Sequence, residues 1–301
     1  MATLPPLLRK GDAVRLVAPS GPFDRDRFAA GVACLEHAGL VPIYDDGLFA
    51  RQGYLAGSDA RRAAELCAAM ADESAAALWL ARGGYGATRI LPAVAPSLAR
   101  SRPKWLVGFS DATALHALWQ RQGWASLHGP NMTTLAGWGA AARRDLWAWL
   151  LQGAGPVLSG RTLRGRGQLQ AEVTGGNLTV LAAMAGGGFL PSWVGRIVLL
   201  EDVGERPYRL DRALTTLAQA GALQGVAAFV IGQLTDCDAP AGDGALAVIV
   251  EVLAQLAPEV PILAELAVGH EPSSQALPLG VPATLDLDGG ELRVHAIDQA
   301  G

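Results

Sequence analysis

Short apolar runs alternate with amphipathic segments along the first half of the chain. The runs end at turn residues, which is typical of buried strands. The segments between them carry apolar residues at helical spacing, such as Phe28, Val32 and Leu35 before the stop signal Gly39. The pattern predicts strands at 13–19, 40–46, 76–82 and 103–109, and helices at 26–39, 58–70 and 111–123.

Repetition of strand, turn and helix predicts an α/β fold with a parallel sheet and helices on its faces. In such sheets, functional side chains gather at the carboxyl ends of the strands. The turns that follow residues 76–82 and 103–109 are therefore the first places to look for chemistry.

The pattern changes near Gly153. Residues 153–177 are rich in glycine and polar side chains and lack a helical period, which indicates a linker and the start of a second domain. Apolar periodicity then returns, and the Asp-Gly-Gly within 283–296 predicts a hairpin. We expect an N-terminal domain at 1–153, a linker at 154–171 and a C-terminal domain at 172–301. Within that last domain the pattern predicts strands at 196–202, 226–234 and 261–269, and helices at 208–221 and 244–258.

Composition narrows the class of protein. The chain has 301 residues, half of them hydrophobic, and a net charge of −4 with no basic stripe, so we expect no nucleic-acid partner. No apolar run reaches the ~18 residues of a membrane span, and the start is not typical of a signal peptide. We therefore expect a cytoplasmic protein that does not bind membranes. The three cysteines lack C-x-x-C spacing, so neither a disulfide framework nor a zinc site is expected: Cys34, Cys67 and Cys237.

The glycine turn "RGGYGATR" follows a predicted strand and could bind phosphate. Gly84 and Gly86 begin a G-x-G-x-x-G pattern, but Arg89 stands where the third glycine should be, and no G-K-[ST] is present. The turn is better explained by glycine at positive φ. Its backbone N–H groups could also line an oxyanion site.

Ser110, in "KWLVGFSDATALHALW", has two interpretations. Serine is a favoured N-cap, although Thr113 does not complete a capping box. Alternatively, Gly108 and Ala112 allow a sharp turn between strand and helix that exposes Ser110 as a nucleophile, close to the G-x-S-x-G pattern. Both interpretations stay open on the residues alone.

A serine nucleophile needs a base, and histidine is the usual one. His128 and His270 each follow an apolar segment at a turn, and Glu201 and Asp202 end a predicted strand. A carboxylate there could orient a histidine. The other histidines fall in predicted helices or in the hairpin and are expected to be structural: His37, His116 and His295.

Seven motifs, in order, resemble the LD-carboxypeptidase family of serine peptidases, which includes the muramoyl-tetrapeptide carboxypeptidases. They are "VAPSGP", "ARGGYGATRILP", "GFSDATALH", "HGP", "TGGNLTVL", "LLEDVGERPYRLDR" and "GHEPSSQALPLG". The resemblance implies a Rossmann-like N-terminal domain, a smaller β-rich C-terminal domain and an active site between them. It also implies a homodimer with no metal and no cofactor.

The resemblance implies a triad. Ser110 is the nucleophile, His270 the general base and then acid, and Glu201 the residue that orients His270. The N–H groups of Asp111 and of Gly84, in the Gly83-Gly84 turn, look like the oxyanion hole.

The implied substrate is the murein tetrapeptide, cut between the L-centre of a diamino acid and the terminal D-alanine, as in peptidoglycan recycling. A cation should receive the terminal carboxylate, and Arg82 is the candidate, with a surface ion pair as the alternative. Asn177 could touch substrate, but we expect it to hold loop geometry.

Two departures from the family pattern bear on alternatives. Asn131, in "HGPN", stands where an apolar residue is expected, and the loop after Gly153 is short and lacks an aromatic residue. A microcin-immunity-type peptidase would use the same triad on an aminoacyl-nucleotide analogue, with an aromatic loop stacked on the base. A non-catalytic α/β ligand-binding protein and an α/β-hydrolase are the remaining alternatives.

Overall fold

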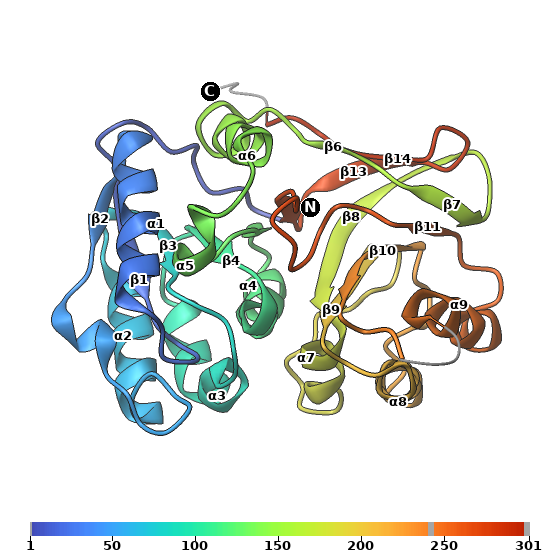
Figure 1. Cartoon of the computed structure of the whole chain (residues 1–301), viewed down its shortest axis with the longest axis horizontal. Helices are drawn as coiled ribbons and strands as arrows, with labels where there is room; N and C mark the ends of the chain where they lie inside the picture. Colours follow the sequence, from blue (N-terminus) through green and yellow to red (C-terminus); the bar gives the residue numbers. More distant parts are fainter. Residues whose placement is uncertain (1, 240–243, 298–301) are drawn as a thin grey trace.

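The alternating pattern of the first half folds as a parallel sheet flanked by helices (Figure 1). The computed structural model describes residues 2–239 and 244–297. The elements of this half are β1 (Ala13–Val17), α1 (Arg25–His37), β2 (Val41–Ile43), η1 (Asp46–Phe49), α2 (Asp59–Ala71), β3 (Ala75–Leu80), α3 (Ala87–Leu98), β4 (Trp105–Gly108), η2 (Ser110–Ala112), α4 (Thr113–Arg121), β5 (Ser126–His128), α5 (Met132–Leu135) and α6 (Ala140–Gln152).

The first sheet has the strand order β12-β5-β4-β3-β1-β2, and strands β1 to β5 are parallel. Buried side chains of α1, α5 and α6 pack into one hydrophobic cluster with one face of this sheet. Those of α2, α3 and α4 belong to a second cluster on the opposite face. The expected Rossmann-like arrangement of helices on both faces of a parallel sheet is confirmed.

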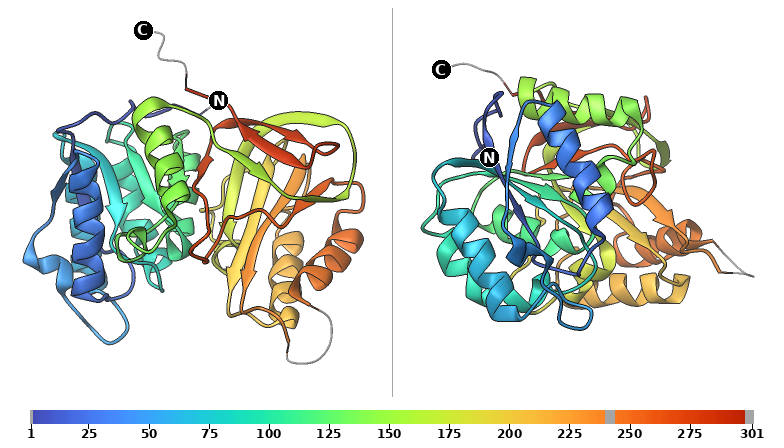
Figure 2. Two further views of the ribbon diagram at one scale, coloured as in Figure 1. Left: turned by 45° about the horizontal axis from the view of Figure 1, so that its top comes forward. Right: turned by 60° about the vertical axis from the view of Figure 1, so that its left-hand side comes forward.

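The second half is built on a mixed sheet with helices on one face (Figure 2). Strands β8 to β11 are parallel, and antiparallel strands flank them in the order β6-β14-β13-β8-β9-β10-β11-β7. The elements are β6 (Val157–Ser159), β7 (Arg161–Arg164), β8 (Gln168–Asn177), α7 (Leu178–Ala183), β9 (Ile197–Val203), α8 (Pro207–Gln219), β10 (Ala228–Thr235), α9 (Ala245–Leu256), β11 (Ile262–Ala264), β12 (Leu277–Leu279), β13 (Pro282–Asp286) and β14 (Glu291–Val294).

The predicted linker at 154–171 is not a structureless connection. It contains β6 and β7 and the start of β8, all hydrogen-bonded into the second sheet. Two of these strands are short, and side chains such as Val157 and Arg161 are exposed, so the segment lacks the apolar period of a buried strand. Hydrogen bonding to partners distant in sequence gives it strand structure.

The two halves share their cores and one strand. Both hydrophobic clusters contain residues from each half. In addition, β12 leaves the second half and pairs antiparallel with β5, where Leu277 lies opposite His128. The chain just before β12 is therefore held against the first sheet. Among the described residues, no helix is long and apolar enough to cross a membrane.

Candidate active site

Ser110 lies on a strained turn at the carboxyl end of β4. Its φ is +64°, a left-handed conformation that is uncommon for residues other than glycine. Helix α4 begins at Thr113 with Ala112 as N-cap and no side-chain capping bond, so Ser110 does not cap it. A Cβ at Gly108 would lie 3.0 Å from the Ala112 Cβ, which explains the small residues around the turn. The structure therefore has the elbow geometry rather than the capped helix.

The glycine turn after β3 runs directly beside this serine. A Cβ built at Gly83 would lie 2.9 Å from Ser110 Oγ, closer than real side chains approach. The carbonyl of Gly83 accepts a hydrogen bond from the Gly21 N–H at 3.1 Å, and Gly84 has a φ of +103°. The turn thus needs glycine twice, once for close approach and once for its backbone conformation.

Asp111 joins the glycine turn to the elbow. Its buried carboxylate accepts the Ala87 N–H, at the first residue of α3, at 2.8 Å. Burial raises the pKa of Asp111, and the hydrogen bonds to its carboxylate act in the opposite direction. The side chain of Asp111 therefore holds the start of α3 against the elbow.

Glu201 and His270 come together from distant parts of the second half. Glu201 lies near the carboxyl end of β9, is completely buried and accepts a hydrogen bond from His270 Nδ1 at 2.8 Å. Burial raises the pKa of Glu201, and His270 counteracts this shift. Because Nδ1 carries the proton of this bond, Nε2 of the neutral ring is left as a proton acceptor.

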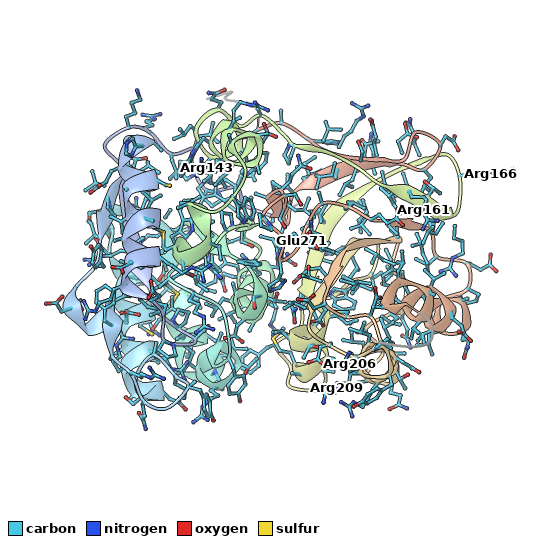
Figure 3. The ribbon with its side chains drawn as sticks, in the orientation of Figure 1. Arg143, Arg161, Arg166, Arg206, Arg209 and Glu271 are labelled. Atoms are coloured by element: carbon cyan, nitrogen blue, oxygen red, sulfur yellow. The ribbon has the colours of Figure 1, made fainter. Side chains whose placement is uncertain are left out.

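His270 is also close to the elbow. Its ring packs on Phe109, the residue before Ser110, with 4.7 Å between the ring centroids. Nε2 is buried and has no hydrogen-bond partner among the described residues. No hydrogen bond joins Ser110 to His270 in the described part of the chain. Glu271, labelled in Figure 3, directly follows His270 and lies between the two halves of the molecule.

Comparisons with known proteins identify the family of this chain. Residues 14–129 match the model of the LD-carboxypeptidase N-terminal domain, and residues 170–285 match the model of the C-terminal domain. The murein tetrapeptide carboxypeptidase of Pseudomonas aeruginosa is 34% identical over 292 residues, covering 93% of this chain and 94% of that protein. The chain belongs to the LD-carboxypeptidase family.

Other relatives also cover more than nine-tenths of the chain. A "probable murein peptide carboxypeptidase" of Bacillus subtilis is 31% identical over 94% of this chain and 91% of its own length. The crystal structure of muramoyltetrapeptide carboxypeptidase from Oxalobacter formigenes superposes with a TM-score of 0.84 at 25% identity, covering 96% of this chain and 100% of that one. The structure of MccF in complex with glutamyl sulfamoyl guanosine has the same fold, with a TM-score of 0.84 at 21% identity and 98% coverage of both chains.

In this family member, Asp202 has a different environment from its neighbour Glu201. Its carboxylate accepts four hydrogen bonds, from Asn177 Nδ2 at 3.0 Å, the Val203 N–H at 2.8 Å, and the N–H and hydroxyl of Thr179 at 2.9 and 2.8 Å. Asn177 in turn caps α7 by accepting the Val180 N–H at 3.1 Å. Both side chains therefore contact the start of α7.

Two buried residues contact the backbone of the elbow: His116, which was expected to be structural, and Asn131, for which no role was predicted. His116 is buried, donates from Nε2 to the Gly108 carbonyl at 2.8 Å and accepts from Ser126 at Nδ1 at 2.9 Å. Burial lowers the pKa of His116 to about 4. Asn131 is also buried and accepts the Phe109 N–H at 3.4 Å. The only sequence signal was that Asn131 departs from the family pattern.

Arg82 is exposed and donates from Nη1 to the Pro22 carbonyl at 2.5 Å. It forms no ion pair within residues 2–239 and 244–297. The surface ion pair considered for Arg82 is therefore not found. Arg82 is one of the residues that line a pocket of about 500 Å³.

Proposed function

We propose that this protein is a serine LD-carboxypeptidase that releases the terminal D-alanine from murein tetrapeptide. The observation that carries the proposal is the buried Glu201–His270 pair, whose imidazole packs on Phe109 beside the strained Ser110. A carboxylate, a histidine and an elbow serine are the three parts of a hydrolytic triad. Murein tetrapeptide carboxypeptidase from Pseudomonas aeruginosa, at 34% identity, supports the substrate.

In the proposed reaction, Ser110 Oγ attacks the carbonyl carbon of the diamino acid while its proton passes to His270 Nε2. Collapse of the tetrahedral intermediate breaks the C–N bond, and His270 gives the proton to the departing D-alanine amine. Water then attacks the acyl ester, His270 takes its proton, and Ser110 regains a proton as the peptide acid leaves. Glu201 stabilises the charged imidazolium in both steps.

The oxyanion of each intermediate is proposed to lie against the N–H groups of Asp111 and Gly84. The contact between Gly83 and Ser110 supports this assignment, because it brings the glycine turn alongside the nucleophile. Preorganised backbone donors of this kind contribute roughly 10²–10³-fold to the rate. We propose Arg82 as a cation for a substrate carboxylate. Asn177 contributes by holding α7 beside Glu201.

The family resemblance also supports a cytoplasmic homodimer that works in peptidoglycan recycling without a metal or cofactor. We include these features in the proposal. Light scattering after gel filtration measures the oligomeric state directly, and a monomeric mass at micromolar concentration would remove the dimer from it.

The deciding experiment incubates L-Ala-γ-D-Glu-meso-diaminopimelate-D-Ala with the wild type and with Ser110→Ala, followed by mass spectrometry. Loss of a single alanine with the wild type only is the expected result. An unchanged peptide with a folded wild type would reject the murein substrate. A glutamyl sulfamoyl nucleoside, the ligand in an MccF structure, is the second substrate to test. Its cleavage in place of the tetrapeptide would establish the microcin-immunity alternative.

A further inference from the structure

A pocket of about 500 Å³ lies on the first half of the molecule, and three arginines line it. Arg27 comes from the first turn of α1, Arg51 from the segment after η1, and Arg82 from the turn after β3. The rest of the lining includes the rings of Phe23 and Phe49. These residues come from separate parts of the chain, so neither sequence spacing nor a family motif indicated the pocket.

The pocket wall is continuous with the surroundings of Ser110. Arg82 directly precedes Gly83, whose Cβ position is 2.9 Å from Ser110 Oγ. Pro22 lies in the pocket wall, and its carbonyl accepts a hydrogen bond from the Arg82 side chain. The N–H of its neighbour Gly21 donates a hydrogen bond to the Gly83 carbonyl. The pocket residue Arg82 is therefore the chain neighbour of Gly83, which passes close to the nucleophile.

The pocket carries an excess of positive charge. None of the three guanidinium groups forms an ion pair with a residue in the described part of the chain. Arg51 donates only to the Gly53 carbonyl, at 3.3 Å. The one carboxylate in the lining, Asp24, is the N-cap of α1 and accepts the Arg27 N–H at 2.8 Å. Three cations and one carboxylate in the same lining favour a ligand with more than one negative group.

We propose that this pocket binds the acyl part of the substrate through its carboxylates. Building on the proposed function, the ligand is the L-Ala-γ-D-Glu-diaminopimelate portion, which carries a carboxylate on D-glutamate and one on the side chain of the diamino acid. The volume suits a ligand of this size and is far larger than an alanine requires. This assigns Arg82 to the acyl part instead of the terminal D-alanine carboxylate.

The first test measures binding of the product tripeptide, L-Ala-γ-D-Glu-meso-diaminopimelate, to Ser110→Ala protein by calorimetry. Arg27→Gln, Arg51→Gln and Arg82→Gln are each added, and Arg121→Gln serves as the matched control. Arg121 is exposed, makes no ion pair with described residues and is not among the pocket residues. Each pocket variant is expected to weaken binding by roughly 10-fold or more, with the control unchanged.

The second test compares tetrapeptides in which one carboxylate is amidated. Amidation of D-glutamate or of the diaminopimelate side chain should lower kcat/KM with the wild type, and the loss should shrink in the arginine variant that pairs with that carboxylate. If Arg82→Gln instead removes the response to a D-alaninamide terminus, the acyl assignment is wrong. If the loss of kcat/KM from amidation and the loss from arginine substitution add in every pair of substrate and variant, no arginine pairs with a carboxylate and the assignment is also overturned.

The two proposals fail in different ways. A wild type that binds the tripeptide through the arginines but releases no D-alanine would reject the proposed function and keep the anion-binding pocket. Turnover with arginine variants that bind and cleave like the wild type would keep the function and overturn the pocket. Adenosine monophosphate, the ligand in a structure of an MccF mutant, is tested as an alternative ligand for the arginine pocket. Arginine-dependent binding of this phosphate without binding of the tripeptide would likewise overturn the carboxylate assignment.

Discussion

Nδ1 of His270 lies 2.8 Å from Oε2 of Glu201, and the carboxylate that accepts this bond is completely buried. The adjacent carboxylate of Asp202 is also buried but faces the start of α7 and accepts four hydrogen bonds there. Two neighbouring acids at the end of one strand therefore have different environments, and the alternation of side chains along β9 separates them.

This separation predicts that two conservative substitutions affect different properties, one the rate of catalysis and the other the stability of the fold. Glu201→Gln should lower kcat by roughly 10³-fold or more, because a neutral amide neither holds the imidazole tautomer nor stabilises its charged form. Asp202→Asn should act on the folded protein instead and lower the free energy of unfolding by about 1–3 kcal/mol, because hydrogen bonds at the α7 N-terminus are lost. Steady-state kinetics and urea titration of both variants check the prediction. Equal kinetic losses would mean that the wrong acid has been assigned to His270.

The left-handed backbone of Ser110 predicts a stability difference between two inactive variants. Ser110→Ala removes the hydroxyl but keeps the strained conformation, whereas Ser110→Gly also relieves it. Ser110→Gly should therefore be more stable than Ser110→Ala by about 1 kcal/mol in denaturant titration, with no turnover by either. If the glycine variant is the less stable one, the turn is not strained in solution.

The contact between Gly83 and Ser110 predicts that a single methyl group blocks the site. In Gly83→Ala the new Cβ would lie 2.9 Å from both Cβ and Oγ of Ser110. A displacement of the nucleophile by a fraction of an ångström should lower kcat/KM by roughly 10–100-fold. The matched control is Gly187→Ala, where the nearest atom is 3.4 Å away and φ is not positive. Normal activity in both variants would contradict the close approach.

The burial of His116 predicts that the protein loses stability as the pH falls. Burial lowers the pKa of His116 to about 4, below the usual 6.5, so the unfolded chain binds the proton more readily than the folded one. This group's contribution is present above about pH 6.5 and is lost progressively as the pH falls toward 4, by about 3 kcal/mol in total. Urea unfolding near pH 7 and pH 5 should show a shallower pH dependence for His116→Gln than for the wild type.

His37→Gln is the control for this comparison, because His37 lies on the exposed side of α1. Part of the acid sensitivity should remain in the His116 variant, since burial also lowers the pKa of the neighbouring His128. An identical pH dependence for wild type and His116→Gln would refute the coupling of His116 protonation to unfolding.

Local pattern was sufficient for much of the fold. The apolar runs at β1, β3, β4, β9 and β10 read as buried strands because both faces of each are covered by helices or by the other layer. Among the described residues, four α-helices were not predicted: α3, α5, α6 and α7, of which α5 and α7 are short. Segment 87–98 contains Pro92 and Pro96, which disfavour a helix interior, and α6 has a weak apolar stripe. Strand β8 was hidden by its glycines and polar residues, because its pairing with β9 and β13 is non-local.

The candidate site was predictable where a motif carries its own signal. Ser110 and His270 follow predicted apolar strands at turns, Glu201 lies at the end of another, and all three match family motifs, so each could be named without coordinates. The supporting contacts could not be named. The bond from His116 to the Gly108 carbonyl and the convergence of Arg27 and Arg51 on Arg82 depend on tertiary packing, which one sequence does not reveal.

The pairing of β12 with β5 limits how this protein can be divided. His270 lies on the segment between β11, in the second sheet, and β12, at the edge of the first. A fragment ending before residue 277 would lose this edge strand and expose the backbone of β5. An exposed strand edge of this kind can pair with another copy of the chain. A cut between the halves therefore leaves the first half without its edge strand and the second half with an unpaired β12. Two separate fragments should regain activity only when β12 of the second fragment pairs with β5 of the first.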